Sequence, residues 1–185
     1  LGNFGKRLVD RGFNLQSLNL LEAGEVPSNT AVLVIAGPRV NLISQEIALL
    51  DQFIARGGNV LWLVDPGELF GLEELAKNLG LARAPGTIID PTTQGFTNSG
   101  SGNPTFTIVS RYGRHRSLDG LDLLTVFPGA GPLSAKPVND WKPSVLLRTS
   151  DAVWAEMDAL SGSVSQDSPR EAGGPFDIGF SFTRA

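Results

Sequence analysis

The stretch Val26–Pro66, VPSNTAVLVIAGPRVNLISQEIALLDQFIARGGNVLWLVDP, contains two short apolar runs separated by an amphipathic segment. The runs are Ala31–Ala36 and Asn59–Val64, and continuous apolar runs of this length are typical of strands covered on both faces. The apolar residues between them recur at the spacing of one helix face: Ile43, Ile47, Leu50 and Ile54. Gly57-Gly58 can supply the left-handed end of that helix. The stretch therefore predicts a strand–helix–strand unit.

Similar patterns continue this alternation on both sides of the unit. Asn3–Arg11 and Leu69–Leu79 have helical periodicity, and Phe13–Leu20 alternates like a strand. Strands that alternate with helices predict an α/β fold with a doubly wound, mostly parallel sheet. After Leu81 only short strands are predicted: Thr87–Asp90, Thr105–Ser110, Leu123–Phe127, Ser144–Thr149 and Phe176–Thr183. We therefore expect extra strands in the C-terminal half.

Length and composition fit a single domain with a substantial core. The chain has 185 residues, of which 41% are hydrophobic and 18% are charged. We predict one α/β domain over residues 1–185, with a strand–helix core in 1–90 and loop-rich strand additions in 91–185. The segments Pro91–Pro104 and Ser161–Gly174 are poor in apolar residues and are predicted to be loops.

Charge and cysteine content exclude several classes of function. The net charge is −4 and no basic block stands out, so we expect no nucleic-acid partner. The chain has no cysteine, which excludes disulfides, thiolate zinc sites and a cysteine nucleophile. A phosphate-binding glycine loop after a strand is also missing from the sequence. We accordingly predict no cofactor and no metal.

The chain begins at Leu1 and directly enters a helical pattern. No run approaches the roughly 20 apolar residues that span a bilayer. We expect a domain excised from a longer protein, in which flanking segments absent from this chain provide the membrane anchor.

The loops after the two buried strands contain polar candidates for a binding site. Ligands of open α/β sheets bind at the carboxyl ends of the strands. Here those ends carry Gly37, Pro38 and Arg39 after the first strand, and Asp65 after the second. Arg39 and Asp65 could orient a polar ligand. The alternative is that Gly-Pro and Asp-Pro only end the strands as turn residues.

His115 is the only histidine, and it lies in the basic cluster Arg111–Arg116. As a general base it would need an orienting acid, for which Asp119 and Asp122 are the candidates nearest in sequence. The alternative is a structural histidine in a solvated loop. Without cysteines, His115 alone cannot build a zinc site.

Trp154 is open to two interpretations. It could line a ligand pocket, or it could close the core as a buried aromatic residue. A serine nucleophile is not favoured, because Gly100-Ser101-Gly102 and Gly162-Ser163 lie in polar segments rather than at a strand-to-helix turn.

Several segments together resemble one family, the GldG-like auxiliary components of gliding-motility-type ABC transporters. Pro27–Pro66 resembles that family's order of apolar strand, Gly-Pro, amphipathic helix, Gly-Gly, apolar strand and Asp-Pro. Further matching elements are Tyr112-Gly113-Arg114-His115, Phe127-Pro128, Thr149-Ser150-Asp151 with Trp154 and Glu156, and Gly174-Pro175. Arg116 stands where the family usually has proline.

The resemblance implies an extracytoplasmic (periplasmic) domain, anchored between membrane segments beside an ABC permease and ATPase. It also implies a flavodoxin-like or class I glutamine-amidotransferase-like fold. The amidotransferase cysteine has no counterpart here, which agrees with a non-catalytic protein. A related domain of intraflagellar transport proteins serves assembly.

These observations predict a non-enzymatic, ligand-binding or assembly domain of an ABC transport system, with a small molecule or a glycan as the possible ligand. One alternative is a hydrolase or glycan-active enzyme that uses His115 and the carboxylates near Asp119. Another is a structural module that binds protein through a sheet edge at Phe176–Phe182. No catalytic residue is assigned, and the candidate binding residues are Gly37, Pro38, Arg39, Asp65, Tyr112, His115, Ser150 and Trp154.

Overall fold

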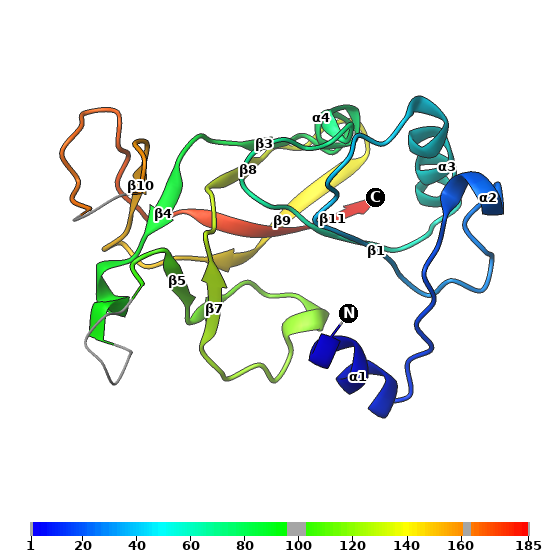
Figure 1. The fold of residues 1–185 in the computed structure, drawn as a ribbon, viewed down its shortest axis with the longest axis horizontal. Coiled ribbons are helices and arrows are strands. Elements are labelled where there is room, and N and C mark those ends of the chain that lie inside the picture. Colours follow the sequence, from blue (N-terminus) through cyan, green and yellow to red (C-terminus); the bar gives the residue numbers. More distant parts are fainter. Residues whose placement is uncertain (1, 96–102, 161–163, 185) are drawn as a thin grey trace. The chain divides into compact units, whose positions relative to one another are not determined.

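A computed structural model describes residues 2–95, 103–160 and 164–184 of the chain (Figure 1). Its internal contacts divide the chain into two compact units. Unit 1 comprises Leu1–Ala36 and Leu42–Trp62, and unit 2 comprises Gly37–Asn41 and Leu63–Ala185. The single domain with an internal boundary near residue 90 stays a prediction.

Unit 1 contains the predicted strand–helix–strand unit. Its elements are α1 (Gly2–Asp10), α2 (Leu20–Ala23), β1 (Leu33–Ala36), α3 (Ser44–Ala55) and β2 (Val60–Leu63), whose last residue belongs to unit 2. β1 and β2 form a parallel pair, and the backbone N–H of Leu33 donates to the carbonyl of Asn59 at 2.9 Å. In the described residues no helix is long and apolar enough to cross a bilayer.

The buried face of α3 is centred on Leu50 and Phe53. Ile43, which was predicted to lie on this face, is half exposed, because it precedes the first turn and its N–H donates to the Glu46 carboxylate at 3.0 Å. The Phe53 ring packs against Gly58, where a β-carbon would lie only 2.4 Å from the ring. Gly58 therefore allows the chain to return closely over its own helix.

Unit 2 is built mainly from short strands. Its elements are α4 (Glu73–Leu79), β3 (Leu81–Arg83), β4 (Thr87–Ile89), η1 (Pro91–Gly95), β5 (Phe106–Val109), β6 (Arg111–Tyr112), η2 (Arg116–Leu118), β7 (Thr125–Pro128), β8 (Leu133–Ala135), β9 (Trp141–Arg148), β10 (Trp154–Glu156) and β11 (Asp177–Arg184). The most deeply buried apolar residues are Leu72, Leu75, Ile88, Ile89, Val109 and Val153.

The strands of unit 2 pair antiparallel. A five-stranded sheet has the order β3-β8-β11-β9-β6, and β10 pairs with β4 and β5 with β7 in separate two-stranded sheets. The two longest strands, β9 and β11, lie side by side along their length (Figure 1). Arg148 on β9 and Asp177 on β11 face one another and form a salt bridge with an Nε–Oδ1 distance of 2.6 Å.

The predicted fold class is wrong. Over the residues that the structure describes, the fold is mostly antiparallel, has few helices and contains no doubly wound, flavodoxin-like sheet. Parallel pairing there is limited to β1 and β2. The physical reason lies in the connections. A parallel pair needs a crossover of about a dozen residues or more, such as the segment that carries α3. Most of the later strands are joined by connections too short for such a crossover, as between Arg83 and Thr87 or Ala135 and Trp141.

Two individual strand predictions are also corrected. Phe13–Leu20 is not a strand, since it pairs with no other segment in the part of the chain that the structure describes. Asn19 instead caps α2 by accepting from the N–H of Leu21. The sheet edge predicted at Phe176–Phe182 is corrected only in part. β11 lies between β8 and β9 in the sheet, but its register with β8 covers only Asp177, whereas Gly179–Arg184 pair with β9.

The two predicted loops are only partly described. Residues 96–102 of Pro91–Pro104 and residues 161–163 of Ser161–Gly174 lie outside the described residues. The described part of Pro91–Pro104 begins with η1. The described part of Ser161–Gly174 contains the buried Glu171, which its low apolar content did not indicate.

Candidate functional site

The ends of β1 and β2 bring Gly37 and Asp65 together, as predicted for neighbouring parallel strands. Gly37 has a φ of +53°, and a β-carbon at this position would lie 2.9 Å from Asp65 Oδ2. Glycine is favoured there by both the left-handed backbone and the close approach. Arg39 and Asp65 are exposed and Pro38 is half-buried, so charged groups are accessible at this position.

Tyr112 holds neighbouring segments of unit 2 together. Its hydroxyl lies 3.0 Å from the Val109 carbonyl, 2.5 Å from the Leu123 carbonyl and 2.9 Å from Thr125 Oγ1. A single hydroxyl has one proton to donate, so the Thr125 hydroxyl can serve as donor to it. These contacts use the polar end of the side chain, and they assign Tyr112 a structural role.

His115 caps the 3-10 helix η2. Its Nδ1 accepts from the backbone N–H of Ser117 at 3.2 Å and lies 2.8 Å from Ser117 Oγ. Within the described residues neither Asp119 nor Asp122 hydrogen-bonds to the imidazole. The orienting acid that a general base needs is therefore not provided by these two residues.

Replacing His115 with alanine is expected to lower the free energy of unfolding by about 1 kcal/mol, because one cap of a short helix is lost. Urea unfolding followed by circular dichroism measures this change. Ser117→Ala, which removes only the hydroxyl partner, is the matched control and should cost no more. A loss of several kcal/mol on removing His115 would contradict a simple capping role.

Ser150 lies in the connection between β9 and β10, and Trp154 is the first residue of β10. The Ser150 hydroxyl is buried and has no hydrogen-bond partner among the described residues. Trp154 is 8% exposed, which fits the interpretation as a core residue. Its Nε1–H donates to Glu156 Oε2 at 3.4 Å. This hydrogen bond connects Trp154, a predicted site residue, to a group of acidic side chains that includes Glu156.

That group is a carboxylate cluster, formed by Glu156, Asp158 and Glu171. One carboxylate oxygen from each residue lies within 4.8 Å of those from the other two. Glu156 and Glu171 are buried, with exposed fractions of 6% and 4%, whereas Asp158 is exposed. The cluster forms because the chain after β10 returns beside it, with Trp154 bridged to Gly173 and the Ala155 N–H bonded to the Ala172 carbonyl.

Backbone N–H groups fix the two buried carboxylates. The N–H of Asp158 donates to Glu156 Oε1 at 3.0 Å, and those of Asp167 and Ser168 donate to Glu171 Oε2 at 2.9 and 3.2 Å. The bond from Asp158 is the main reason why the pKa of Glu156 lies below its usual value, although burial acts in the opposite direction. Glu156 is therefore held as a carboxylate in a buried position.

Sequence reasoning named Glu156 only as part of a family motif, and it missed Asp158 and Glu171. Local signals are weak here, because Glu171 is separated from Glu156 by a polar segment that looks solvent-exposed. The predicted residues themselves do not converge. Gly37 and Asp65 lie close together at the ends of β1 and β2. Tyr112, on β6, hydrogen-bonds to neighbouring segments, and His115 caps η2. Trp154 hydrogen-bonds to Glu156 of the carboxylate cluster.

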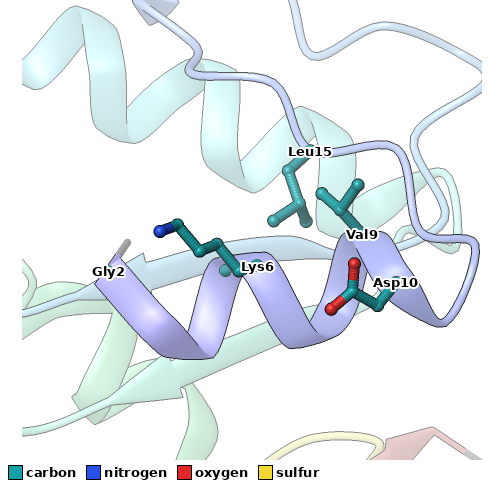
Figure 2. A pocket seen from close by; sticks show the side chains of 6 residues that line it. Gly2, Lys6, Val9, Asp10 and Leu15 are labelled. Carbon is teal, nitrogen blue, oxygen red and sulfur yellow. The ribbon is translucent and has the colours of Figure 1, made fainter.

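Each unit also has a surface hollow, and neither is lined by a predicted site residue. In unit 1 a hollow of about 430 Å³ lies along α1, where Val9 and Leu15 point toward one another (Figure 2). In unit 2 a hollow of about 550 Å³ lies beside α4 and β3, and its lining includes Glu73, Arg83 and Lys136.

Comparisons with known proteins identify a family and a related fold. A family model described as "ABC-type uncharacterized transport system" matches residues 2–183. The solved structure titled "mmIFT52 N-terminal domain" is similar with a TM-score of 0.58 and 19% identity, over 80% of this chain and 69% of that chain. At this level of identity the likeness concerns the fold alone. A comparison with curated proteins gives no match.

Proposed function

Since the chain belongs to the family of auxiliary components of ABC-type transport systems, we propose that it is a non-catalytic docking module, which binds the permease of its transporter. The observation that carries this proposal is the meeting of Gly37 and Asp65 at the ends of the parallel strands. It supports a defined, charged surface at the ends of β1 and β2.

We call this surface the strand-end surface and define it by Gly37, Pro38, Arg39, Val40 and Asp65. The Val40 side chain is 77% exposed, and it stands next in sequence to the exposed Arg39. An exposed apolar side chain among charged ones is a common composition for a protein contact, in which arginine is enriched. This composition supports a protein partner for the strand-end surface.

A small-molecule ligand is less well supported by the geometry. Ligand pockets are concave and bury most of the ligand. No residue of the strand-end surface lines either of the two hollows described above. The alternative of a hydrolase loses its geometric basis as well, because the partner of His115 is Ser117 rather than a carboxylate.

The narrower assignments are part of this proposal. The motif order favours a GldG-like component of a gliding-motility-type transporter. We further propose that the domain lies on the extracytoplasmic face of the membrane, anchored by segments outside this chain, and that permease and ATPase complete the transporter.

Site-specific photo-crosslinking tests the docking proposal in the full-length protein. A benzophenone amino acid placed at Arg39 or at Asp65 is expected to give a covalent adduct with the permease in native membranes, identified by mass spectrometry. Lys142, an exposed residue on β9, is the matched control position and should give none.

The charge reversal Arg39→Glu provides a second readout. It is expected to reduce co-purification of the permease at least tenfold, whereas Lys142→Glu should leave it unchanged. Adducts at all three positions, or equal co-purification of both variants, would contradict a docking role for the strand-end surface.

A further inference from the structure

We propose that the carboxylate cluster of Glu156, Asp158 and Glu171 binds a calcium ion. Nothing in this inference depends on the proposed docking function, since the cluster lies on β10 and the segments around it rather than at the strand-end surface.

The first argument is the cost of the arrangement without a cation. Two buried carboxylates that lie within a few ångströms repel one another, and burial also removes the water that would screen them. Among the described residues the cluster has one salt bridge, in which Arg170 Nη2 lies 4.0 Å from Asp158 Oδ1. Both of those side chains are exposed, so this pair does not neutralise Glu156 and Glu171.

The second argument is an oxygen without a partner. Glu171 is 4% exposed, and its Oε1 is buried with no hydrogen-bond partner among the described residues. Its other oxygen accepts two backbone N–H groups, which orient the carboxylate and leave Oε1 available. A buried, unpaired anionic oxygen is rare because it loses its hydration without compensation. A bound cation would supply the missing partner.

The donor set and its spacing favour calcium among the biological cations. All three ligands are carboxylate oxygens. Hard cations such as calcium and magnesium prefer oxygen ligands, whereas zinc and copper favour nitrogen and sulfur ligands. A calcium shell is about 4.6 to 5.2 Å across, whereas a magnesium shell is only about 4.0 to 4.2 Å across. The three oxygens lie within 4.8 Å of one another, which a calcium shell can span. Calcium also accepts several carboxylates in a flexible geometry, whereas magnesium usually keeps several of its waters. Water and backbone carbonyls complete such shells.

Thermal unfolding of the full chain after treatment with a chelator tests the proposal. Calcium chloride is expected to raise the melting temperature by about 5 to 10 °C at saturation, with a dissociation constant between about 10⁻⁶ and 10⁻³ M by calorimetry. Magnesium chloride at the same concentration should give a clearly smaller shift.

Two variants separate calcium binding from a structural role. Glu171→Gln is expected to abolish the calcium-dependent shift, yet to melt no lower than the wild type in chelator, because it removes a repulsive charge while keeping the shape. Asp158→Asn, at an exposed ligand, should weaken binding at least tenfold without affecting folding. Asp140→Asn, at an exposed acid between β8 and β9, is the matched control and should bind like the wild type.

The proposal is overturned if calcium does not raise the melting temperature of the wild type. It is equally overturned if Glu171→Gln keeps the full calcium response.

Discussion

Replacing Gly113 with alanine is expected to lower the free energy of unfolding by about 4 kcal/mol or more, or to prevent folding. A β-carbon at this position would lie 1.7 Å from the carbonyl oxygen of Val145 and 2.8 Å from its carbonyl carbon. Both neighbours are backbone atoms, which cannot rotate away as a side chain would. The two segments would have to separate, although the N–H of Gly113 bonds to the Leu146 carbonyl at 2.8 Å.

The separation would also break the pairing of β6 with β9 and displace Tyr112, which is in register with Leu147. Urea unfolding followed by circular dichroism measures the effect. Gly173→Ala is the matched control, because a β-carbon there would meet no atom within 4 Å. Its unfolding should change by less than about 0.5 kcal/mol. Equal midpoints for the two variants would show that β6 does not approach β9 this closely.

Replacing Asp90 with alanine is expected to lower the free energy of unfolding by about 3 kcal/mol. Asp90 is 1% exposed and lies just after β4. Its Oδ1 accepts from the N–H of Thr92 at 3.0 Å and from the Thr92 hydroxyl at 2.5 Å, and its Oδ2 accepts from the N–H of Ile108 at 3.1 Å. The carboxylate therefore joins the end of β4 to β5, and alanine would leave these donors unpaired in a buried place.

Asp90→Asn refines this prediction. Asparagine keeps the volume and one acceptor oxygen, so its cost should be smaller, about 1 to 2 kcal/mol. Asp122→Ala, at an exposed acid of the same unit, is the control and should be nearly neutral. The interpretation fails if Asp90→Ala unfolds at the same urea concentration as the control.

Sequence reasoning located most elements of the chain but not their pairing. The helices at α1, α3 and α4 and the strands β1, β2, β4, β5, β7, β9 and β11 were anticipated to within a few residues. The short strands β3, β6, β8 and β10 were missed, because two or three residues carry no periodicity that could be recognised. The prediction of a parallel sheet was correct for the one strand–helix–strand unit, but it was wrong for the rest of the chain.

The candidate site residues stay predictions, and only some of their spatial relations could be inferred from the sequence. Gly37 and Asp65 could be placed together, because adjacent parallel strands end on the same side and the connection between them is a single helix. Glu171 could not be placed beside Glu156, since the contact depends on how the polar segment after β10 folds back. No property of the intervening residues indicates that return.

The sequence by itself determined the strand–helix–strand unit of Val26–Pro66 and the exclusion of cysteine chemistry. It also pointed to an auxiliary component of an ABC transport system, which the family match over residues 2–183 confirms. Only the tertiary structure decided the antiparallel pairing, the close approach of Gly113 to Val145, the buried Asp90 and the carboxylate cluster. The reason is physical. Periodicity and turn residues act between neighbours along the chain, whereas strand direction, register and the burial of charge depend on contacts between residues far apart in sequence.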